Sequence, residues 1–183
     1  LADDFSPYFL ATHESFLSPT KLFLVAEGGE VREIKAMPER FDASGLSVSQ
    51  RQAKSPDGTV IPYFLVHSAS LKRDGNNPTL LYGYGGFEVP MTPGYSPVTG
   101  KLWLERGGVY ALANIRGGGE FGPRWHQGAK RENRQRAFDD FIAVAEDLAA
   151  NGISSPKRLA IMGGSNGGLL MGVVVNQRPD LYA

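Results

Sequence analysis

One serine stands among four glycines in the segment Gly-Gly-Ser-Asn-Gly-Gly at residues 163–168. Residues 163–167 fit the pattern G-x-S-x-G, with a short apolar run before them and a longer apolar run after them. A strand, this pattern and a helix in succession are typical of a nucleophile elbow, a sharp turn that lifts a serine hydroxyl clear of a sheet. We therefore interpret Ser165 as the nucleophile of an acyl-transfer reaction.

The glycines and the asparagine of this segment have physical roles in such a turn. The residues two positions before and after the serine approach each other closely, so a Cβ atom at Gly163 or Gly167 would clash. The turn also points the backbone N–H of Asn166 at the reaction centre, where the start of a helix favours negative charge. The alternative is a tight glycine turn without chemistry, which does not account for the flanking strand and apolar helix.

A second glycine cluster, Tyr-Gly-Tyr-Gly-Gly-Phe, occupies residues 82–87 and follows an apolar run. An elbow needs a second donor to the oxyanion, and it usually comes from the loop after an earlier strand. Glycines let the backbone or a tyrosine hydroxyl come close to a substrate. The alternative is that Tyr82 and Tyr84 are ordinary aromatic residues of a strand.

A third cluster, Gly-Gly-Gly-Glu-Phe-Gly at residues 117–122, satisfies the pattern G-x-G-x-x-G after a predicted strand. Dinucleotide binding would need a helix immediately afterwards and an acidic residue at the end of the next strand. Pro123 and a run of polar residues follow instead, so this pattern does not favour a nucleotide site. No G-K-[ST] follows any glycine cluster, which excludes a P-loop.

The composition of the 183 residues excludes several other classes. Lys plus Arg and Asp plus Glu number 19 each, so the formal charge is zero and nothing favours nucleic acid or an anionic membrane surface as a partner. There is no cysteine, which excludes disulfides and thiolate metal sites. No apolar run approaches the roughly 20 residues of a membrane span. We expect no cofactor, no metal, no nucleic acid and no membrane.

Apolar patterns predict the secondary structure. Residues 20–36 indicate two short strands around a Gly-Gly turn, and residues 37–45 indicate a linker. A turn at residues 56–58 leads to a strand, in which Pro62 suits an edge position. Further segments follow, predicted as a helix at about 133–150 that stops near Gly152, a strand at 158–162 and a helix at about 166–177.

The order of these elements predicts the fold class. From residue 78 onward, strands alternate with helices or loops, and the strands are continuously apolar, as expected when both faces of a sheet are covered. This pattern indicates an α/β protein with a largely parallel sheet. The residues before about 45 contain only short β elements, which fits the end of a separate β domain.

Several of these segments together resemble one family. The segments LLYGYGGF, ANIRGGGEFG, FDDF and SPKRLAIMGGSNGGLL, with NQRPDL near the end, resemble the catalytic domain of prolyl oligopeptidases, serine peptidases of the α/β-hydrolase fold. The similarity begins at about Phe41. The resemblance implies an incomplete α/β-hydrolase domain at residues 41–183, with a mostly parallel sheet and flanking helices. It also implies that residues 1–40 are the last strands of a β-propeller and a linker.

The resemblance implies an activity and its residues. Prolyl oligopeptidases cut short peptides after proline, and YGYGGF favours them over oligopeptidase B and acylaminoacyl peptidases. Carried over, Ser165 is the nucleophile, Asn166 gives its backbone N–H to the oxyanion, the Tyr84 hydroxyl is the second donor and Phe87 lines the pocket for the substrate proline. The alternatives are an esterase or acylaminoacyl hydrolase on the same fold, or a fragment that only binds or assembles.

The rest of a catalytic triad is not evident in the sequence. α/β-Hydrolases order the triad as serine, acid and histidine, but residues 166–183 contain Asp180 and no histidine. The three histidines all precede Ser165, and we interpret His126, in PRWHQ, as a structural neighbour rather than a base. Four more charged residues have structural interpretations: Asp139 and Asp140 on or against a helix, and Arg116 and Glu120 paired with each other.

These observations predict a piece of a larger enzyme that is truncated at both ends. We expect the chain alone to be inactive, and to self-associate or to need its missing C-terminal segment as a partner. A short peptide is the expected substrate. We expect the parent protein in the cytoplasm, with the periplasm as the alternative.

Overall fold

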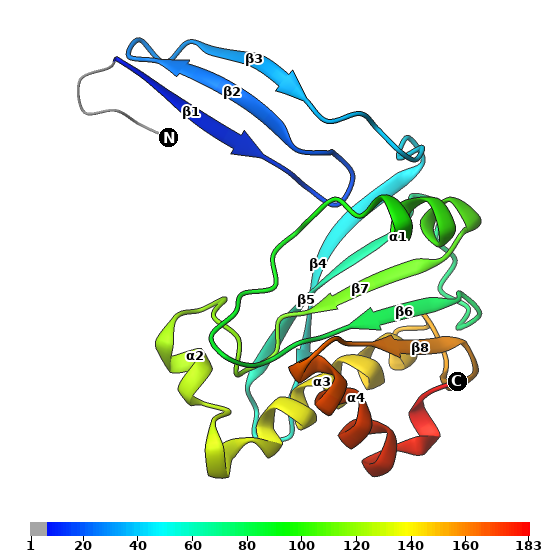
Figure 1. The fold of residues 1–183 in the computed structure, drawn as a ribbon. Helices are drawn as coiled ribbons and strands as arrows, with labels where there is room; N and C mark the ends of the chain where they lie inside the picture. The colour runs from blue at the N-terminus through cyan, green and yellow to red at the C-terminus, as the bar shows by residue number, and fades with distance from the viewer. Residues whose placement is uncertain (1–6) are drawn as a thin grey trace.

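The computed structural model describes residues 7–183, which form two separate sheets. Residues 1–6, which the sequence analysis assigned to the first β region, lie outside the described residues. The first sheet is antiparallel and contains β1 (Tyr8–His13), β2 (Lys21–Ala26) and β3 (Val31–Ala36) in that order. Figure 1 shows it at one end of the molecule, away from the helices. The two strands predicted around a Gly-Gly turn are confirmed as β2 and β3.

The second sheet has five strands in the order β4-β5-β7-β6-β8. They span, in chain order, Leu46–Lys54, Val60–Ser68, Thr79–Tyr82, Val109–Ala113 and Leu159–Met162. The pairs β6–β7 and β6–β8 are parallel, which confirms the arrangement predicted from residue 78 onward. The pairs β4–β5 and β5–β7 are antiparallel, so the complete sheet is mixed rather than mostly parallel.

The prediction that Pro62 lies on an edge strand is wrong. Pro62 belongs to β5, which pairs with β4 on one side and β7 on the other. The ladder between β5 and β7 begins only at Tyr63, opposite Ala113, and Pro62 contributes its carbonyl to the Asn114 N–H at 3.0 Å. A proline is tolerated here because no ladder bond requires its missing N–H.

Two long helices, α3 (Gln135–Ala150) and α4 (Asn166–Gln177), pack together beside the five-stranded sheet (Figure 1). Both match the predicted helices. The main core lies between them and the sheet, and its fully buried large side chains include Tyr63, Leu81, Phe141, Leu148 and Leu170. Gly152 follows α3 with a φ of 66°, and a Cβ there would lie 2.7 Å from the Arg73 carbonyl oxygen. The predicted helix stop therefore has a steric basis.

A smaller core cluster lies on the opposite face of the sheet. Leu65 and Val66 are neighbours in β5 but belong to different clusters, as side chains of a strand alternate between faces. The second cluster includes Phe41, whose ring stacks on Tyr95 with centroids 4.9 Å apart. The short helices α1 (Pro97–Leu102) and α2 (Pro123–Gln127) lie in the connections before and after β7.

The parallel strands place three loops at one edge of the sheet. Because β6, β7 and β8 run in the same direction, the segments that follow Tyr82, Ala113 and Met162 all leave at their carboxyl ends (Figure 1). Ligands of open α/β sheets bind at this edge. The three glycine clusters of the sequence are these three loops.

Candidate active site

Ser165 lies at the junction between β8 and α4, as an elbow requires. Its backbone has φ 53° and ψ −116°, a region that costs a residue with a side chain about 1–3 kcal/mol. Its side chain is exposed to solvent. The surrounding structure must hold such a strained backbone in place. In proteins, strain of this kind clusters at functional sites.

The two glycines of the motif are required by close backbone approaches. A Cβ on Gly163 would lie 2.6 Å from the carbonyl oxygen of Gly167, within the elbow itself. A Cβ on Gly167 would lie 2.7 Å from the carbonyl oxygen of Gly83, in the loop after β6. The predicted clash is thus confirmed at both positions, but at Gly167 the elbow meets a different loop.

The start of α4 presents an open donor beside Ser165. Gly167 N–H donates to the Gly164 carbonyl at 2.7 Å, and Gly168 N–H donates to the Ser165 carbonyl at 2.8 Å. Within residues 7–183, by contrast, neither the Asn166 N–H nor the Ser165 hydroxyl has a hydrogen-bond partner. An amide at the first position of a helix carries positive partial charge, so it suits a developing oxyanion.

The side chain of Asn166 joins the elbow to the loop at 83–87. Its Nδ2 donates to the Tyr84 carbonyl oxygen at 2.6 Å, and Gly86 lies so close that a Cβ there would meet the amide. The sequence predicts a role only for the backbone of Asn166. Its side-chain role depends on a residue 82 positions away, and no local pattern could have indicated it.

Arg134, just before α3, donates hydrogen bonds both to the elbow and to the loop at 83–87. Its guanidinium donates to the Gly85 carbonyl through Nη1 and to Asn166 Oδ1 through Nη2, the latter at 3.2 Å. It also lies 5.2 Å from the centre of the Phe138 ring, a favourable cation–π arrangement. The site therefore contains a functional candidate that the sequence analysis missed.

Phe87 lies at the end of the same loop, with 74% of its surface exposed. It has φ 55°, and the next residue, Glu88, has φ 57°. Phe87 and Asn166 both line a cavity of about 460 Å³ next to the elbow. An exposed aromatic ring on strained backbone is available to contact a ligand.

The third glycine cluster packs against the loop after β6 and does not form a nucleotide-binding site. A Cβ on Gly117 would collide with the Gly85 carbonyl, and a Cβ on Gly119 would collide with the Glu88 carbonyl. Contrary to the expectation from the sequence, a helix does begin directly after the cluster, at Pro123, but it has only five residues. The glycines at 117–119 therefore let the loop after β7 pack directly on the loop after β6.

His126 takes part in the same packing. Its Nδ1 lies 2.7 Å from the Gly117 carbonyl oxygen and 3.1 Å from the Glu88 amide nitrogen. With the proton on Nδ1, the ring donates to Gly117. No hydrogen bond joins His126 to Ser165 in the described part of the chain, which supports the interpretation of His126 as a structural neighbour.

Comparison with known proteins agrees with this geometry. The sequence profile of the prolyl oligopeptidase family matches residues 95–183. An uncharacterized peptidase of Sinorhizobium fredii is 58% identical over 182 residues, which are 99% of this chain and 25% of the relative. A prolyl endopeptidase of Elizabethkingia miricola is 40% identical over 91% of this chain and 24% of its own length. The structure of a post-proline cleaving enzyme from Rickettsia typhi superposes with a TM-score of 0.88 and 48% identity, over 94% of this chain and 25% of that one.

The chain belongs to the prolyl oligopeptidase family. Its α/β-hydrolase fold is that of its structural neighbours in the family. It spans about a quarter of the length of the relatives that it matches.

In this member of the prolyl oligopeptidase family, contacts bring the predicted site residues to one edge of the sheet. Ser165 and Asn166 form the elbow, the Tyr84 carbonyl accepts from Asn166, and Phe87 shares a cavity wall with Asn166. The Tyr84 side chain is half-buried. Their chemical roles stay predictions.

The predicted pairing of Arg116 with Glu120 is wrong. Arg116 donates through Nε and Nη2 to Asp140, at 2.8 Å and 2.6 Å, and also contacts Asp57. The Arg116 guanidinium lowers the pKa of the Asp57 carboxyl from its ordinary value. Asp140 is fully buried, whereas Asp139 is partly exposed and accepts from Gln135. Through these two ion pairs Arg116 joins α3 to the turn between β4 and β5, which is a structural role.

Glu120 instead holds the segment after Phe87. Its Oε1 accepts from the Met91 N–H at 2.9 Å, while Oε2 is buried without a hydrogen-bond partner in the described residues. Burial raises the pKa of this carboxyl. The one charged residue of the glycine cluster therefore stabilises the loops, and it has no hydrogen bond to the elbow.

Residues 7–183 contain no group of three or more His, Asp or Glu side chains arranged to hold a metal ion. None of the helices that the structure describes is long and apolar enough to cross a membrane.

Proposed function

We propose that this chain is part of a serine peptidase that cleaves short peptides after proline through an acyl-enzyme at Ser165. The observation that carries the proposal is the strained, exposed Ser165 between β8 and α4, in a chain of the prolyl oligopeptidase family. Relatives called prolyl endopeptidase and a neighbour called post-proline cleaving enzyme support the specificity. The cytoplasmic location stays a prediction from the sequence.

The proposed reaction assigns one role to each site residue. Ser165 Oγ attacks the carbonyl carbon of the scissile bond and gives up its proton to a base. The Asn166 N–H and the Tyr84 hydroxyl donate to the oxyanion of the tetrahedral intermediate. Its collapse breaks the C–N bond while the protonated base gives its proton to the leaving nitrogen, so the amine departs and an ester remains on Ser165. Water then hydrolyses this ester, which releases the carboxylic acid and restores the Ser165 hydroxyl. The Phe87 ring contacts the substrate proline.

We place the acid and the histidine of the triad outside residues 1–183. Two observations support this placement: the chain spans about a quarter of its relatives' length, and no described histidine bonds to Ser165. A serine hydroxyl is a weak nucleophile without an adjacent base. The chain alone should therefore have little activity.

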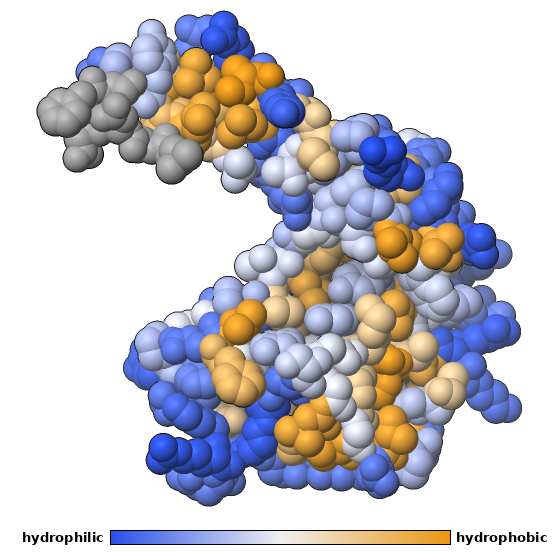
Figure 2. Space-filling view, in the orientation of Figure 1, coloured by the Kyte–Doolittle hydropathy of each residue, from blue (hydrophilic) through white to orange (hydrophobic). Residues whose placement is uncertain are grey.

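We also propose the two-domain division at residues 40 and 41. The β1-β2-β3 sheet shares no strand with the five-stranded sheet, and several of its apolar side chains are exposed, including Phe9, Val31 and Ile34. Figure 2 shows apolar side chains gathered on this sheet, across a hollow from the main body. Phe41 is buried in the main body, where Phe16 from the connection between β1 and β2 also packs. This arrangement supports propeller strands followed by the catalytic domain.

Hydrolysis of reporter peptides by the full-length protein tests the proposal. We expect turnover of a Gly-Pro reporter well above that of an Ala-Ala reporter, and no turnover of either by the Ser165→Ala variant. Equal turnover of the two reporters would contradict proline specificity. Ester hydrolysis without peptide hydrolysis would instead support an esterase on the same fold.

A further inference from the structure

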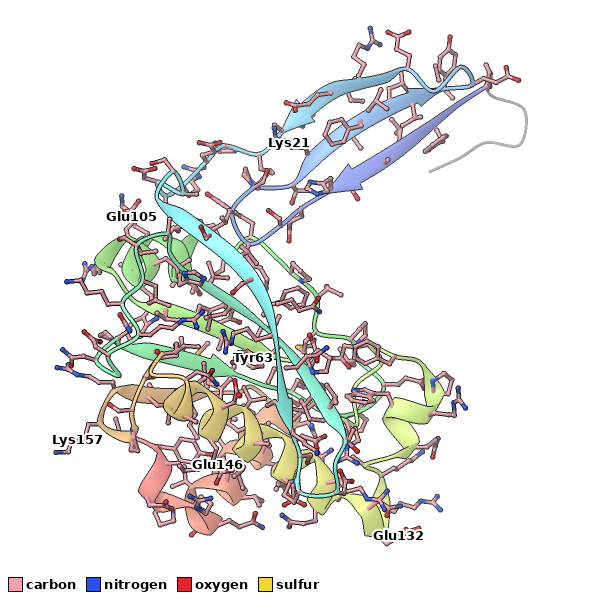
Figure 3. The ribbon with its side chains drawn as sticks, turned by 180° about the vertical axis from the view of Figure 1, so that it is seen from behind. Lys21, Tyr63, Glu105, Glu132, Glu146 and Lys157 are labelled. Atoms are coloured by element: carbon pink, nitrogen blue, oxygen red, sulfur yellow. The ribbon has the colours of Figure 1, made fainter. Side chains whose placement is uncertain are left out.

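The cavity beside the elbow has two chemically different walls. Asn166 and Phe87, both in the proposed active site, belong to one wall. The other wall comes from the segment at 129–134 that connects α2 to α3, where Figure 3 labels Glu132 at the surface. The cavity volume of about 460 Å³ is large enough for one or two residues of a peptide.

The second wall carries a local excess of positive charge. Lys130, Arg131 and Arg134 line the cavity, and Glu88 is its one carboxylate. None of these three cations forms an ion pair within residues 7–183. The excess is local, because the whole chain has a formal charge of zero.

Two other arginines of the chain, unlike Arg134, are paired with carboxylates. Arg116 pairs with two aspartates, and Arg178 pairs with Glu146 and Asp180. Arg134 is half-buried yet contacts only neutral oxygens and an aromatic ring, and this burial lowers its pKa. A desolvated cation without a counterion is costly, so an anion from a ligand would offset that cost. A guanidinium has five N–H donors, and Arg134 uses two of them.

Both walls of the cavity contain residues with a strained backbone. Arg131 has φ 52°, and Phe87 and Glu88 on the facing loop have φ 55° and φ 57°. These residues, with Ser165, are all of the non-glycine residues with positive φ that the structure describes. Strained backbone persists only where the surrounding packing holds it in place, and in proteins it clusters at active sites and ligand-binding segments.

We propose that this cavity is a subsite for a carboxylate of the peptide substrate, with Lys130, Arg131 and Arg134 as its cationic wall. The carboxylate belongs either to an Asp or Glu side chain next to the proline or to a free C-terminus. The inference rests on the proposed peptidase function, since Asn166 and Phe87 connect the cavity to the reaction centre.

Matched peptide pairs test the subsite in the full-length protein. One pair of quenched reporter peptides differs only by Asp or Asn next to the proline, and a second pair differs only by a free or amidated C-terminus. In one of the pairs we expect kcat/KM to be about three- to tenfold higher for the peptide with the carboxylate at low salt, as for charge-assisted hydrogen bonds at a partly exposed site. The preference should shrink at about 0.5 M NaCl, where screening is strong. The pair that shows it identifies the source of the carboxylate.

Substitutions of the cationic wall test whether it causes the preference for a carboxylate. In the Lys130→Gln/Arg131→Gln protein, the kcat/KM ratio within the responding pair should fall toward one. The matched control is Arg124→Gln, which removes an exposed cation of α2 outside the cavity and should keep the ratio. Equal kcat/KM within both pairs of the wild-type protein, or a ratio unchanged in the double variant, would overturn the subsite.

Calorimetric binding of the same peptides to the Ser165→Ala protein separates the two proposals. A Kd ratio that favours the carboxylate and is lost in the double variant supports the subsite even if no peptide is hydrolysed. Hydrolysis without any carboxylate preference supports the peptidase and rejects the subsite.

Discussion

At the scale of single residues, the Tyr84 hydroxyl is the proposed donor with the sharpest expected effect. The Tyr84→Phe variant of the full-length protein should lose about 10²–10³-fold in kcat, the usual loss for one oxyanion donor. KM should change little, because the bond forms mainly in the transition state. Steady-state kinetics on the Gly-Pro reporter measure both constants.

Tyr82→Phe is the matched control for this prediction. Tyr82 ends β6 two residues earlier, and its side chain packs in the smaller core cluster on the other face of the sheet. Its variant should keep a normal kcat. A tenfold higher KM with unchanged kcat in Tyr84→Phe would instead make Tyr84 a residue that binds the ground state.

At the scale of elements, Arg134 links the start of α3 to the elbow and to the loop after β6. Arg134→Met removes both hydrogen bonds while keeping most of the side-chain volume, so Asn166 and the Tyr84 loop lose a shared anchor. We expect kcat on a neutral Gly-Pro reporter to fall by about tenfold, since misplacement of oxyanion donors costs transition-state stabilisation. Arg134→Lys should recover part of this loss.

Arg136→Met controls for the loss of an arginine near the start of α3. Arg136 is exposed and donates to the Gly128 carbonyl, away from the elbow. Its variant should keep kcat. A melting temperature that falls equally in both variants, with kcat unchanged, would make Arg134 a purely structural residue.

At the scale of the whole molecule, the surface around α4 should govern association. Leu169 and Val175 of α4 are 57% and 44% exposed, Met162 at the end of β8 is 43% exposed, and β8 is an edge strand. Figure 2 shows apolar side chains gathered over α4. Exposed apolar surface beside an open strand favours association, so residues 1–183 expressed alone should self-associate in sedimentation experiments.

A double substitution on α4 tests whether this surface is responsible. Leu169→Lys/Val175→Lys should shift the sedimenting species toward monomer, because lysines at the contact repel each other and cost desolvation. Val98→Lys/Leu102→Lys on α1, which removes apolar side chains that are 67% and 56% exposed, should leave association unchanged. A compact monomer of the unsubstituted chain would contradict the prediction.

Features that depend on local chain geometry can be predicted from the amino-acid sequence. The glycines of the elbow, the period of apolar residues in α3 and α4 and the continuous apolar strands each reflect constraints among near neighbours in the chain. These patterns predicted the junction at Ser165, the bounds of both long helices and the parallel strands after residue 78. They failed at Pro62, because which strand lies at an edge depends on partners elsewhere in the chain.

Which distant side chains meet depends on how the helices and strands pack in three dimensions. The Asn166 amide contacts a carbonyl 82 positions earlier, and Asp140 accepts from Ser55 across 85 positions. Arg116 and Asp140 pair because the fold brings the loop after β7 against α3, and Arg134 joins the elbow because α3 begins beside the loop after β6. Such contacts leave no periodic trace in the chain, since each depends on one pair of distant residues meeting in the folded core.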